Sequence, residues 1–301
     1  MQRDWLVFLE VLQSWMISNR FASQAAAVVL RRRARQLLVD FDHQDPARSQ
    51  QRILRGLVHK GSATAFGRER DFRRIQTPAD FRRLVPLNVQ GDEPSDAWNP
   101  DPKSHALAAL TALGLADTVR TNGRCGKGGV IVTAASADLG QQLKALLPTF
   151  VRPLVHFHAG EPSLADGALA LHSIWTAVGA VAIEDPRYGQ LRLLTDHRVY
   201  LEFVPLEKVG QSNPVRITLD EVERGAAYAV VMTTASGVWA RLTDIAVAFE
   251  RRNPPLVIRV PALHIPQPLS QQPPHRQIAD TPAVRLETHV HNPWSTPVDL
   301  G

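Results

Sequence analysis

The sequence contains a single cysteine, Cys125, among its 301 residues. An intrachain disulfide is therefore excluded, and the composition fits a reducing compartment, so we expect a cytoplasmic protein. No apolar run approaches the roughly 18 residues that a bilayer-spanning helix needs. The apolar start, residues 5–9, is followed at once by Glu10 and has no small-residue cleavage site. A signal peptide is not expected.

Signals for nucleic-acid binding and for several catalytic centres are also missing. The net charge is +5, yet the sequence has no stripe of Lys and Arg with interleaved aromatic residues, so we expect no nucleic-acid partner. It has no G-x-S-x-G nucleophile elbow either. The pairs His156/His158 and His289/His291 have the alternate spacing of a strand face, but neither has a third ligand nearby in a recognised pattern. We therefore expect no metal site built from them.

A cluster of glycines at residues 126–129 could cradle a phosphate with its backbone N–H groups. However, no Ser or Thr follows Lys127, and the spacing does not give G-x-G-x-x-G before a helix. Residues 130–132 are Val, Ile and Val, which favour a β-strand. We interpret the glycines as a turn that leads into this strand.

Residues 1–90 carry a helical pattern. Apolar residues recur every three to four positions through residues 5–39, with a break at 19–20, and again through residues 45–61. Thr77 and Pro78 form an amino-terminal cap for a further short helix. The basic run at residues 31–35 is interpreted as a solvated helix face, with an anionic partner or a membrane surface as the alternative. We expect a helical lead-in that packs on a sheet.

Residues 91–260 are predicted to form an α/β body. Residues 105–115 and 141–155 have the composition of helices. From residue 179 onward, apolar and polar residues alternate around turns, and residues 200–204 are rich in aromatic and β-branched side chains. We expect a mixed or antiparallel sheet of about four strands over residues 179–249, within a β-rich half that extends to residue 260. The apolar fraction of 44% is enough to build its core.

Three segments resemble one known family. Residues 199–205, Val-Tyr-Leu-Glu-Phe-Val-Pro, are similar to an F-F-E-F-I/V-P strand, and residues 221–225 followed by Tyr228 are similar to an E-V-x-x-G-x-x-Y segment. Near the amino end, residues 65–87 are similar to a T-x-F/Y-G-R…F…D-F-R-x-x-V-P-L opening. These motifs belong to the auxin-responsive acyl acid amido synthetase (Gretchen Hagen) family. The chain resembles a shortened and divergent bacterial-type member.

This resemblance implies a shortened version of the large domain of adenylate-forming ligases, an α/β fold with a mixed sheet and flanking helices. It implies that ATP and magnesium activate a small carboxylic acid as an acyl adenylate, which an amino acid then attacks to form an amide. By the same resemblance Gly179, Arg241 and Asp244 are candidate nucleotide-binding residues, with Asp244 contacting the ribose hydroxyls. No catalytic residue is assigned.

The sequence departs from the family at the ATP-binding motifs. No Ser/Thr/Gly-rich phosphate loop occurs between Leu87 and His105, and Val178 stands where the family has a glutamate suited to magnesium. Thr243 replaces the glycine that precedes the ribose-binding aspartate. We therefore expect catalysis to be impaired or lost, with a non-catalytic binding or structural pseudoenzyme as the alternative. A decaying gene product without a selected activity is a third hypothesis.

Residues 261–301 differ sharply in composition from the rest of the chain. Eight prolines alternate there with Gln, Ser and His, and apolar residues are few. Such a segment cannot repay the entropy of forming a core of its own, so we expect an extended tail. Proline-rich stretches are pre-extended, which makes this tail a candidate binding segment for a protein partner.

Overall fold

The computed structural model describes residues 20–89, 101–121, 130–134, 136–149, 151–152, 154–159, 169–176 and 178–261. All of them lie in one compact unit, Met1–Pro268. The helices in these ranges are α2 (Arg20–His43), α3 (Pro46–Gly61), α4 (Ala65–Glu69), α5 (Pro78–Leu84), α6 (Pro102–Thr121) and α7 (Ala137–Leu146), with short 3-10 helices η1 (Phe72–Arg74) and η3 (Leu206–Lys208). Over the described ranges, no helix is long and apolar enough to cross a membrane.

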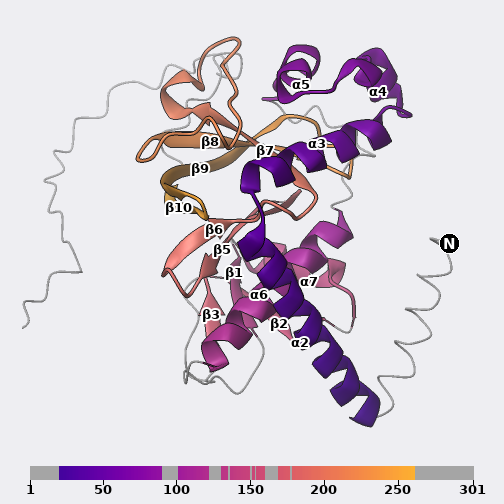
Figure 1. The fold of residues 1–301 in the computed structure, drawn as a ribbon, viewed down its shortest axis with the longest axis vertical. Helices are drawn as coiled ribbons and strands as arrows, with labels where there is room; N and C mark the ends of the chain where they lie inside the picture. The colour runs from indigo at the N-terminus through magenta and orange to yellow at the C-terminus, as the bar shows by residue number, and fades with distance from the viewer. Residues whose placement is uncertain are drawn as a thin grey trace, which may run out of the picture. The chain divides into compact units, whose positions relative to one another are not determined.

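The strands form two sheets (Figure 1). The larger sheet is antiparallel throughout and has the order β4-β5-β6-β10-β9-β8-β7, and the smaller one is parallel with the order β2-β1-β3. The strands of the larger sheet are β4 (Ser173–Thr176), β5 (Gly179–Asp185), β6 (Gln190–Leu193), β7 (Val199–Pro205), β8 (Ala227–Thr234), β9 (Arg241–Arg252) and β10 (Pro255–Val260). Those of the smaller sheet are β1 (Val130–Ala134), β2 (Val155–Ala159) and β3 (Leu169–Leu171). The predicted α/β class with flanking helices is confirmed.

Two sequence-based boundaries change in the structure. Residues 179–249 were expected to hold about four strands, whereas β5 to β9 all begin there, because the turn after Asp185 returns the chain into the short strand β6. The helix expected over residues 141–155 is shorter and starts earlier. Ser136 caps α7 by accepting a hydrogen bond from the Leu139 amide, and Pro148 follows its end. The remaining residues leave room for β2, which carries both exposed histidines, His156 and His158.

The larger sheet is buried on both faces. Along β7, Val199, Leu201 and Phe203 point into one apolar cluster, while Tyr200 and Val204 point into another. The first cluster also contains Ile174, Val178, Val230 and Met232, so the two edges of the sheet share one interior and the sheet must curve strongly. Successive side chains along such a strand therefore point alternately into two apolar cores, and neither face of the strand is exposed to solvent.

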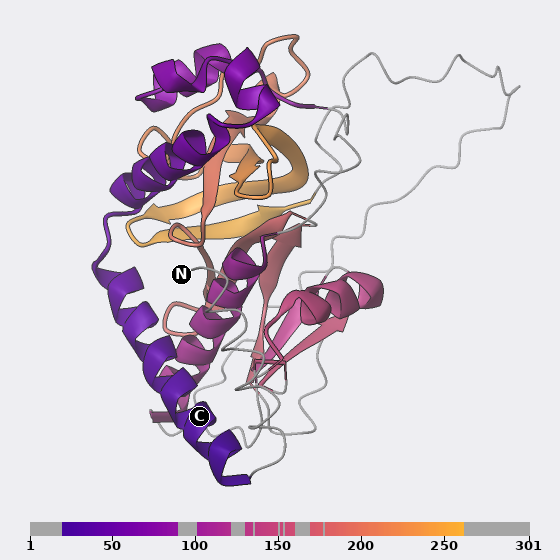
Figure 2. The same cartoon turned by 90° about the vertical axis from the view of Figure 1, so that its right-hand side faces the viewer.

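Helices cover the outer side of this curved sheet in two groups (Figure 2). α3, η1 and α5 supply Leu54, Phe72 and Phe81 to the cluster over β7, β8 and β9. α2, α6 and α7 pack with the small parallel sheet and with β4 and β5 in a separate cluster. α5 begins with the predicted cap, because Thr77 and Asp80 bond to each other's backbone in a capping box.

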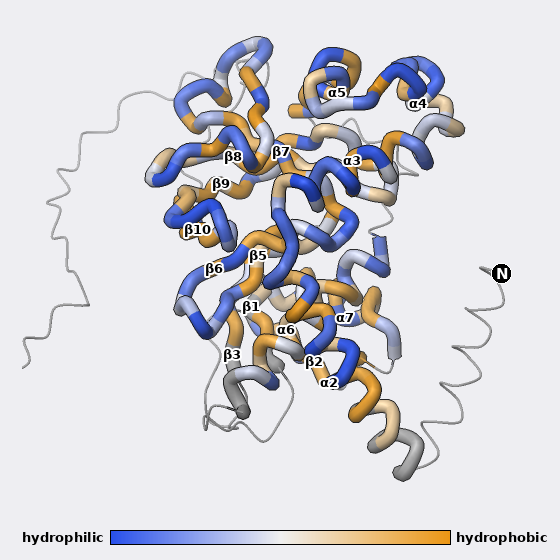
Figure 3. The backbone as a smooth tube through the Cα atoms, in the orientation of Figure 1, coloured by the Kyte–Doolittle hydropathy of each residue, from blue (hydrophilic) through white to orange (hydrophobic). Residues whose placement is uncertain are grey.

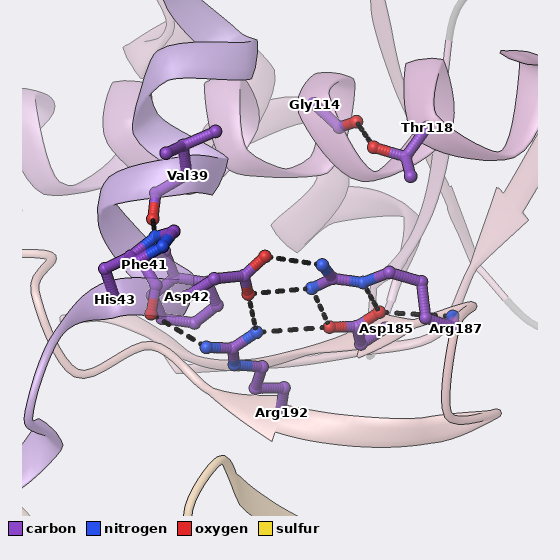
Figure 4. Close-up of polar contacts among 9 residues, drawn as sticks. All are labelled: Val39, Phe41, Asp42, His43, Gly114, Thr118, Asp185, Arg187 and Arg192. Carbon is purple, nitrogen blue, oxygen red and sulfur yellow. Dashed lines mark hydrogen bonds and ion pairs between the residues drawn. The ribbon is translucent and has the colours of Figure 1, made fainter.

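A half-buried ionic clamp fastens the end of α2 to the hairpin of β5 and β6 (Figure 4). Arg187 donates to both oxygens of Asp42 at 2.6 and 3.0 Å and to Asp185 Oδ1 at 2.8 Å. Arg192, whose side chain is 4% exposed, pairs with both aspartates and donates to the Phe41 carbonyl. Burial raises the pKa of Asp42, but the two arginines outweigh it and leave that pKa below its usual value.

We predict that Asp42→Asn lowers the free energy of unfolding at pH 7 by about 2 kcal/mol, because it leaves charge on Arg187 and Arg192 incompletely paired. Asp40→Asn, at an exposed site on the same helix, is the matched control and should be near neutral. Urea unfolding measures both. An acid in the last turn of a helix interacts unfavourably with the helix dipole. If the clamp contributed no stability, Asp42→Asn would therefore be neutral or slightly stabilising.

Candidate functional site

Gly179, the first predicted nucleotide contact, opens β5 and is buried. The Thr176 hydroxyl closes the preceding turn by donating to the Gly179 carbonyl at 2.9 Å and accepting from the Gly179 amide at 3.1 Å. A Cβ atom added to Gly179 would lie 3.2 Å from Val199 Cγ2, 3.4 Å from Met232 Cε and 3.6 Å from Ser104 Oγ. Packing against these neighbours explains why glycine is suited to the position.

Arg241, the second predicted contact, is the first residue of β9 and pairs with Met232 of β8. Asn88 lies beside it in a parallel bridge, donating from its amide to the Ala240 carbonyl and accepting at its carbonyl from the Leu242 amide, both at 2.9 Å. The segment that leaves α5 through residues 85–87 is thereby tied to the start of β9. Ala240 has a φ of 46°, an uncommon conformation for a residue other than glycine.

Met232 connects these two predicted residues. Its backbone pairs with Arg241, and its side chain packs against Gly179 from the interior of the sheet. Its sulfur also accepts a contact from the Thr176 hydroxyl at 3.4 Å. Gly179 and Arg241, which are 62 positions apart in the sequence by their numbers, therefore both border Met232, one at its side chain and the other at its backbone.

Asp244, the third predicted contact, lies three residues farther along β9 and is exposed. Three residues of extended strand correspond to roughly 10 Å, so Asp244 is separated from the start of the strand. The pairing of β8 with β9 is irregular here, and Thr243 turns inward to donate to the Val230 carbonyl at 2.8 Å. The structure places Asp244 on the same strand as Arg241 but beyond the contacts around Met232.

The amino end of α6 reaches the same region, and the sequence did not single it out. Ser104, which is 1% exposed, is the α6 residue that borders Gly179. His105 is fully buried and stacks on Trp175, with ring centroids 5.5 Å apart. Asp101 Oδ2, Ser104 Oγ and His105 Nε2 are buried atoms without a hydrogen-bond partner. The Asp101-Pro102 pair was the available signal, because it marks the start of a helix.

The positive dipole end of α6 is already partly neutralised by the Asp101 carboxylate. Asp101 Oδ1 accepts from the Lys103 amide at 3.1 Å, and the Asp101 carbonyl lies 2.9 Å from His105 Nδ1. Burial lowers the pKa of His105, and Asp101 offsets only part of that effect, so the imidazole is neutral at pH 7. A helix amino terminus attracts anions, but a carboxylate placed there competes with a phosphate for the same amides.

The residues described by the structure contain no preformed metal cage. Among them, no group of three or more His, Cys, Asp or Glu side chains is arranged to hold a metal ion. Val178, at the position expected to be acidic, contributes its side chain to the apolar interior instead. The segment in which the phosphate loop is expected to be missing lies largely at residues 90–100, outside the described residues.

A second ionic network, with Arg216 and Glu202 buried at its centre, positions α5 above β7. Arg216 donates to Glu202 Oε2 at 2.9 Å and to the carbonyls of Arg82 and Val85 at 3.0 and 2.6 Å. In return, Arg82 donates to the Arg216 carbonyl and to Glu221, both at 2.8 Å. These bonds hold the carboxyl end of α5, from which the chain runs to Asn88 beside Arg241.

Two segments of the chain match models of known protein-family domains. Residues 38–89 match the model for the GH3 family N-terminal domain, and residues 192–257 match the model for the GH3 family central domain. The matched segments are similar to two domains of the GH3 family and together cover less than half of the chain. The resemblance expected from the sequence motifs is thereby confirmed, and the two matched segments include both sides of the α5 network.

Two solved GH3 structures are similar to part of the chain. They are a "GH3.15 acyl acid amido synthetase" and an "AtGH3.15 acyl acid amido synthetase in complex with 2,4-DB". Each is 17% identical with a TM-score of 0.26, and the match covers 40% of this chain and 24% of that chain. The chain thus spans about a quarter of their length. A search of curated proteins found no match.

Glu202 and His197 are predicted to have opposite effects on the pH dependence of stability. Burial raises the pKa of Glu202 to about 7, an effect that Arg216 and Arg82 offset only in part. Its stabilising contribution is therefore full below the unfolded pKa of 4.5 and is lost as pH rises through 7. Burial lowers the pKa of His197 to about 4, so its contribution is full above 6.5 and is lost as pH falls.

We predict that the wild type loses on the order of 3 kcal/mol of unfolding free energy relative to Glu202→Gln as pH rises from 4.5 to 7.5. His197→Asn is the contrast, because the wild type should gain unfolding free energy relative to this variant as pH rises. Urea unfolding at several pH values measures both. If the pair with Arg216 kept Glu202 ionised throughout, the wild type would instead gain stability relative to Glu202→Gln as pH rises.

We also predict that Gly179→Ala destabilises the protein by about 1 kcal/mol, because Val199 and Met232 must shift to admit the methyl group. The same change at Gly56, a position in α3 with no atom within 4 Å of the added Cβ, should stabilise by up to about 1 kcal/mol through helix propensity. Thermal unfolding compares the two. An unaffected Gly179→Ala variant would show that this region yields readily to a larger side chain.

Proposed function

We propose that this GH3 chain is an acyl acid amido synthetase-type protein in which adenylation is impaired or lost. The observation that carries the proposal is the packing at Gly179. There the GH3 scaffold brings Gly179, Arg241 and Asn88 to one place, but Val199, Met232 and Ser104 pack against the glycine. The scaffold supports descent from a ligase of this kind, and the packing supports a weakened nucleotide site.

Two further features support impaired chemistry. An adenylating enzyme must neutralise the triphosphate with backbone donors and a cation while the phosphate bond breaks. Val178 supplies no oxygen ligand, and the start of α6 carries the carboxylate of Asp101 near the amides that a phosphate would use. Both features disfavour a bound magnesium–ATP complex.

If activity persists, the proposed reaction consumes ATP with magnesium to activate a small carboxylic acid and then joins it to an amino acid. In that case Gly179, Arg241 and Asp244 are the proposed nucleotide contacts. Arg241 would face the negative charge of the nucleotide, and the exposed Asp244 carboxylate could accept hydrogen bonds from ribose hydroxyls. We assign no catalytic role to any pair of side chains within the described ranges.

Exchange of labelled pyrophosphate into ATP tests the proposal directly, with magnesium and a panel of small carboxylic acids. We predict that the purified full chain exchanges pyrophosphate no faster than its Asp244→Ala variant. Exchange well above background that disappears in Asp244→Ala would overturn the loss of adenylation and would support an active ligase. Asp220→Ala, at an exposed acid away from β9, is the control for a general effect of removing charge.

Titration calorimetry with ATP distinguishes a non-catalytic relative that still binds nucleotide from one that does not. Heat of binding that is lost in Arg241→Ala, without pyrophosphate exchange, indicates a pseudoenzyme that has kept its nucleotide site. Absence of binding indicates a binding or structural protein that keeps only the fold. The close packing at Gly179 favours the absence of nucleotide binding.

The proposed setting is a cytoplasmic protein that does not bind nucleic acid. The single cysteine supports a reducing compartment, and the absence of a clustered basic and aromatic stripe in the sequence argues against nucleic acid. The proline-rich residues 261–301 are proposed as a segment that binds a protein partner. Residues 262–301 lie outside the described residues, so the sequence composition alone supports this part of the proposal.

A further inference from the structure

The outward face of α2 combines exposed valines with a run of arginines. Val28, Val29 and Val39 are 64%, 66% and 55% exposed, which are high values for apolar side chains. Arg31, Arg32 and Arg33 are exposed as well, and the Arg35 side chain is 60% exposed. Figure 3 shows the apolar amino-terminal part of α2 followed by a hydrophilic band. We call these seven residues the α2 face.

The α2 face is not needed to pack the helix onto the protein. Ala34, Leu38 and Phe41 on the opposite side are buried in the cluster with α6. The two helices approach closely, since a Cβ atom added to Gly114 of α6 would lie 2.7 Å from the Ala34 carbonyl oxygen. In Figure 2, α2 runs along the outer edge of the described part of the molecule. The fold therefore already satisfies one side of α2 and presents the other.

The charge on the α2 face is largely uncompensated. Arg35 pairs with Asp117 of α6, but Arg31, Arg32 and Arg33 have no acidic partner within the described ranges. Among the described residues that line the hollow of about 790 Å³ along this side of α2, Asp40 is the exposed acid that borders these arginines. Two copies of this face would repel each other, so symmetric self-association through it is disfavoured.

Helical geometry places the valines between the arginines. At about 100° per residue, Val28 and Val39 fall near the middle of the α2 face, with Arg31 and Arg35 on one flank and Arg33 on the other. The two valines are separated by roughly 16 Å along the helix. Arginines that flank apolar residues on both sides can extend to a plane of phosphates while the apolar residues meet the plane itself.

We propose that the α2 face binds an anionic lipid surface. The arginines span about 200° of the helix circumference, slightly more than half, which is wider than one acidic helix of a protein partner would cover. Long, flexible arginines can bend toward a planar array of phosphates from both flanks, and a guanidinium bonds a phosphate through two N–H groups. The exposed valines add a small apolar contact at the headgroup boundary.

Co-sedimentation of the full chain with vesicles tests the proposal. The probes are vesicles of phosphatidylcholine with 30 mol% phosphatidylserine and vesicles of phosphatidylcholine alone. We expect binding to the anionic vesicles at 50 mM salt, weaker binding at 300 mM salt and none to the neutral vesicles. Absence of binding to the anionic vesicles at low salt would overturn the proposal.

Charge-reversal variants locate the binding surface. Arg31→Glu, Arg32→Glu and Arg33→Glu combined should lower the vesicle partition coefficient on the order of 100-fold or more, since each basic residue near such a surface contributes about fivefold. The matched control reverses three exposed arginines elsewhere, Arg55, Arg73 and Arg224, and should keep more of the binding. Circular dichroism verifies that both variants remain folded. Equal losses in the two variants would contradict a localised surface.

Two further measurements separate the lipid surface from other anionic partners. Val28→Ser with Val39→Ser leaves the charge unchanged and should reduce vesicle binding by a smaller factor than the arginine variant. Soluble polyglutamate should not displace the vesicles when it carries the same total charge. Displacement by polyglutamate, together with an unaffected valine variant, would replace the lipid surface with an acidic protein partner.

Discussion

The structure depends on a curved antiparallel sheet that is buried on both faces. Because β7 sends Val199, Leu201 and Phe203 to one core and Tyr200 and Val204 to another, neither face can be left to solvent. α3 and α5 cover one side, and the edges of the sheet share the interior on the other. A polar residue within such a strand needs a partner from outside it, and Arg216 supplies that partner to Glu202.

The α5 network connects this sheet to the candidate site. Arg216 and Arg82 fix the end of α5 through backbone carbonyls, so the residues that follow reach Asn88 beside Arg241 with little freedom. Both sides of the network fall in segments that match GH3 models. The scaffold around the proposed nucleotide site is therefore well defined, and Val178 and the close packing at Gly179 are the features behind the proposed weakening of that site.

Much of the scaffold could be predicted from local sequence. Thr77, Pro78 and Asp80 specify the start of α5 because a cap depends on neighbouring residues, and residues 200–204 specify a strand because their composition suits one. Ser104 and His105 escaped notice because nothing local distinguishes them from other residues of an alanine-rich helix. Their interest arises from burial beside Gly179 and Trp175, which distant segments provide.

The sequence by itself determined the α/β class, the resemblance to the GH3 family and the apolar Val178 before Gly179, since each follows from residue identity and short-range order. Only the tertiary structure decided that Gly179 and Arg241 border Met232, that Asp244 lies apart on β9, and that α2 presents valines and arginines outward. These relations depend on sheet curvature and helix packing, which arise from contacts between residues far apart in the chain.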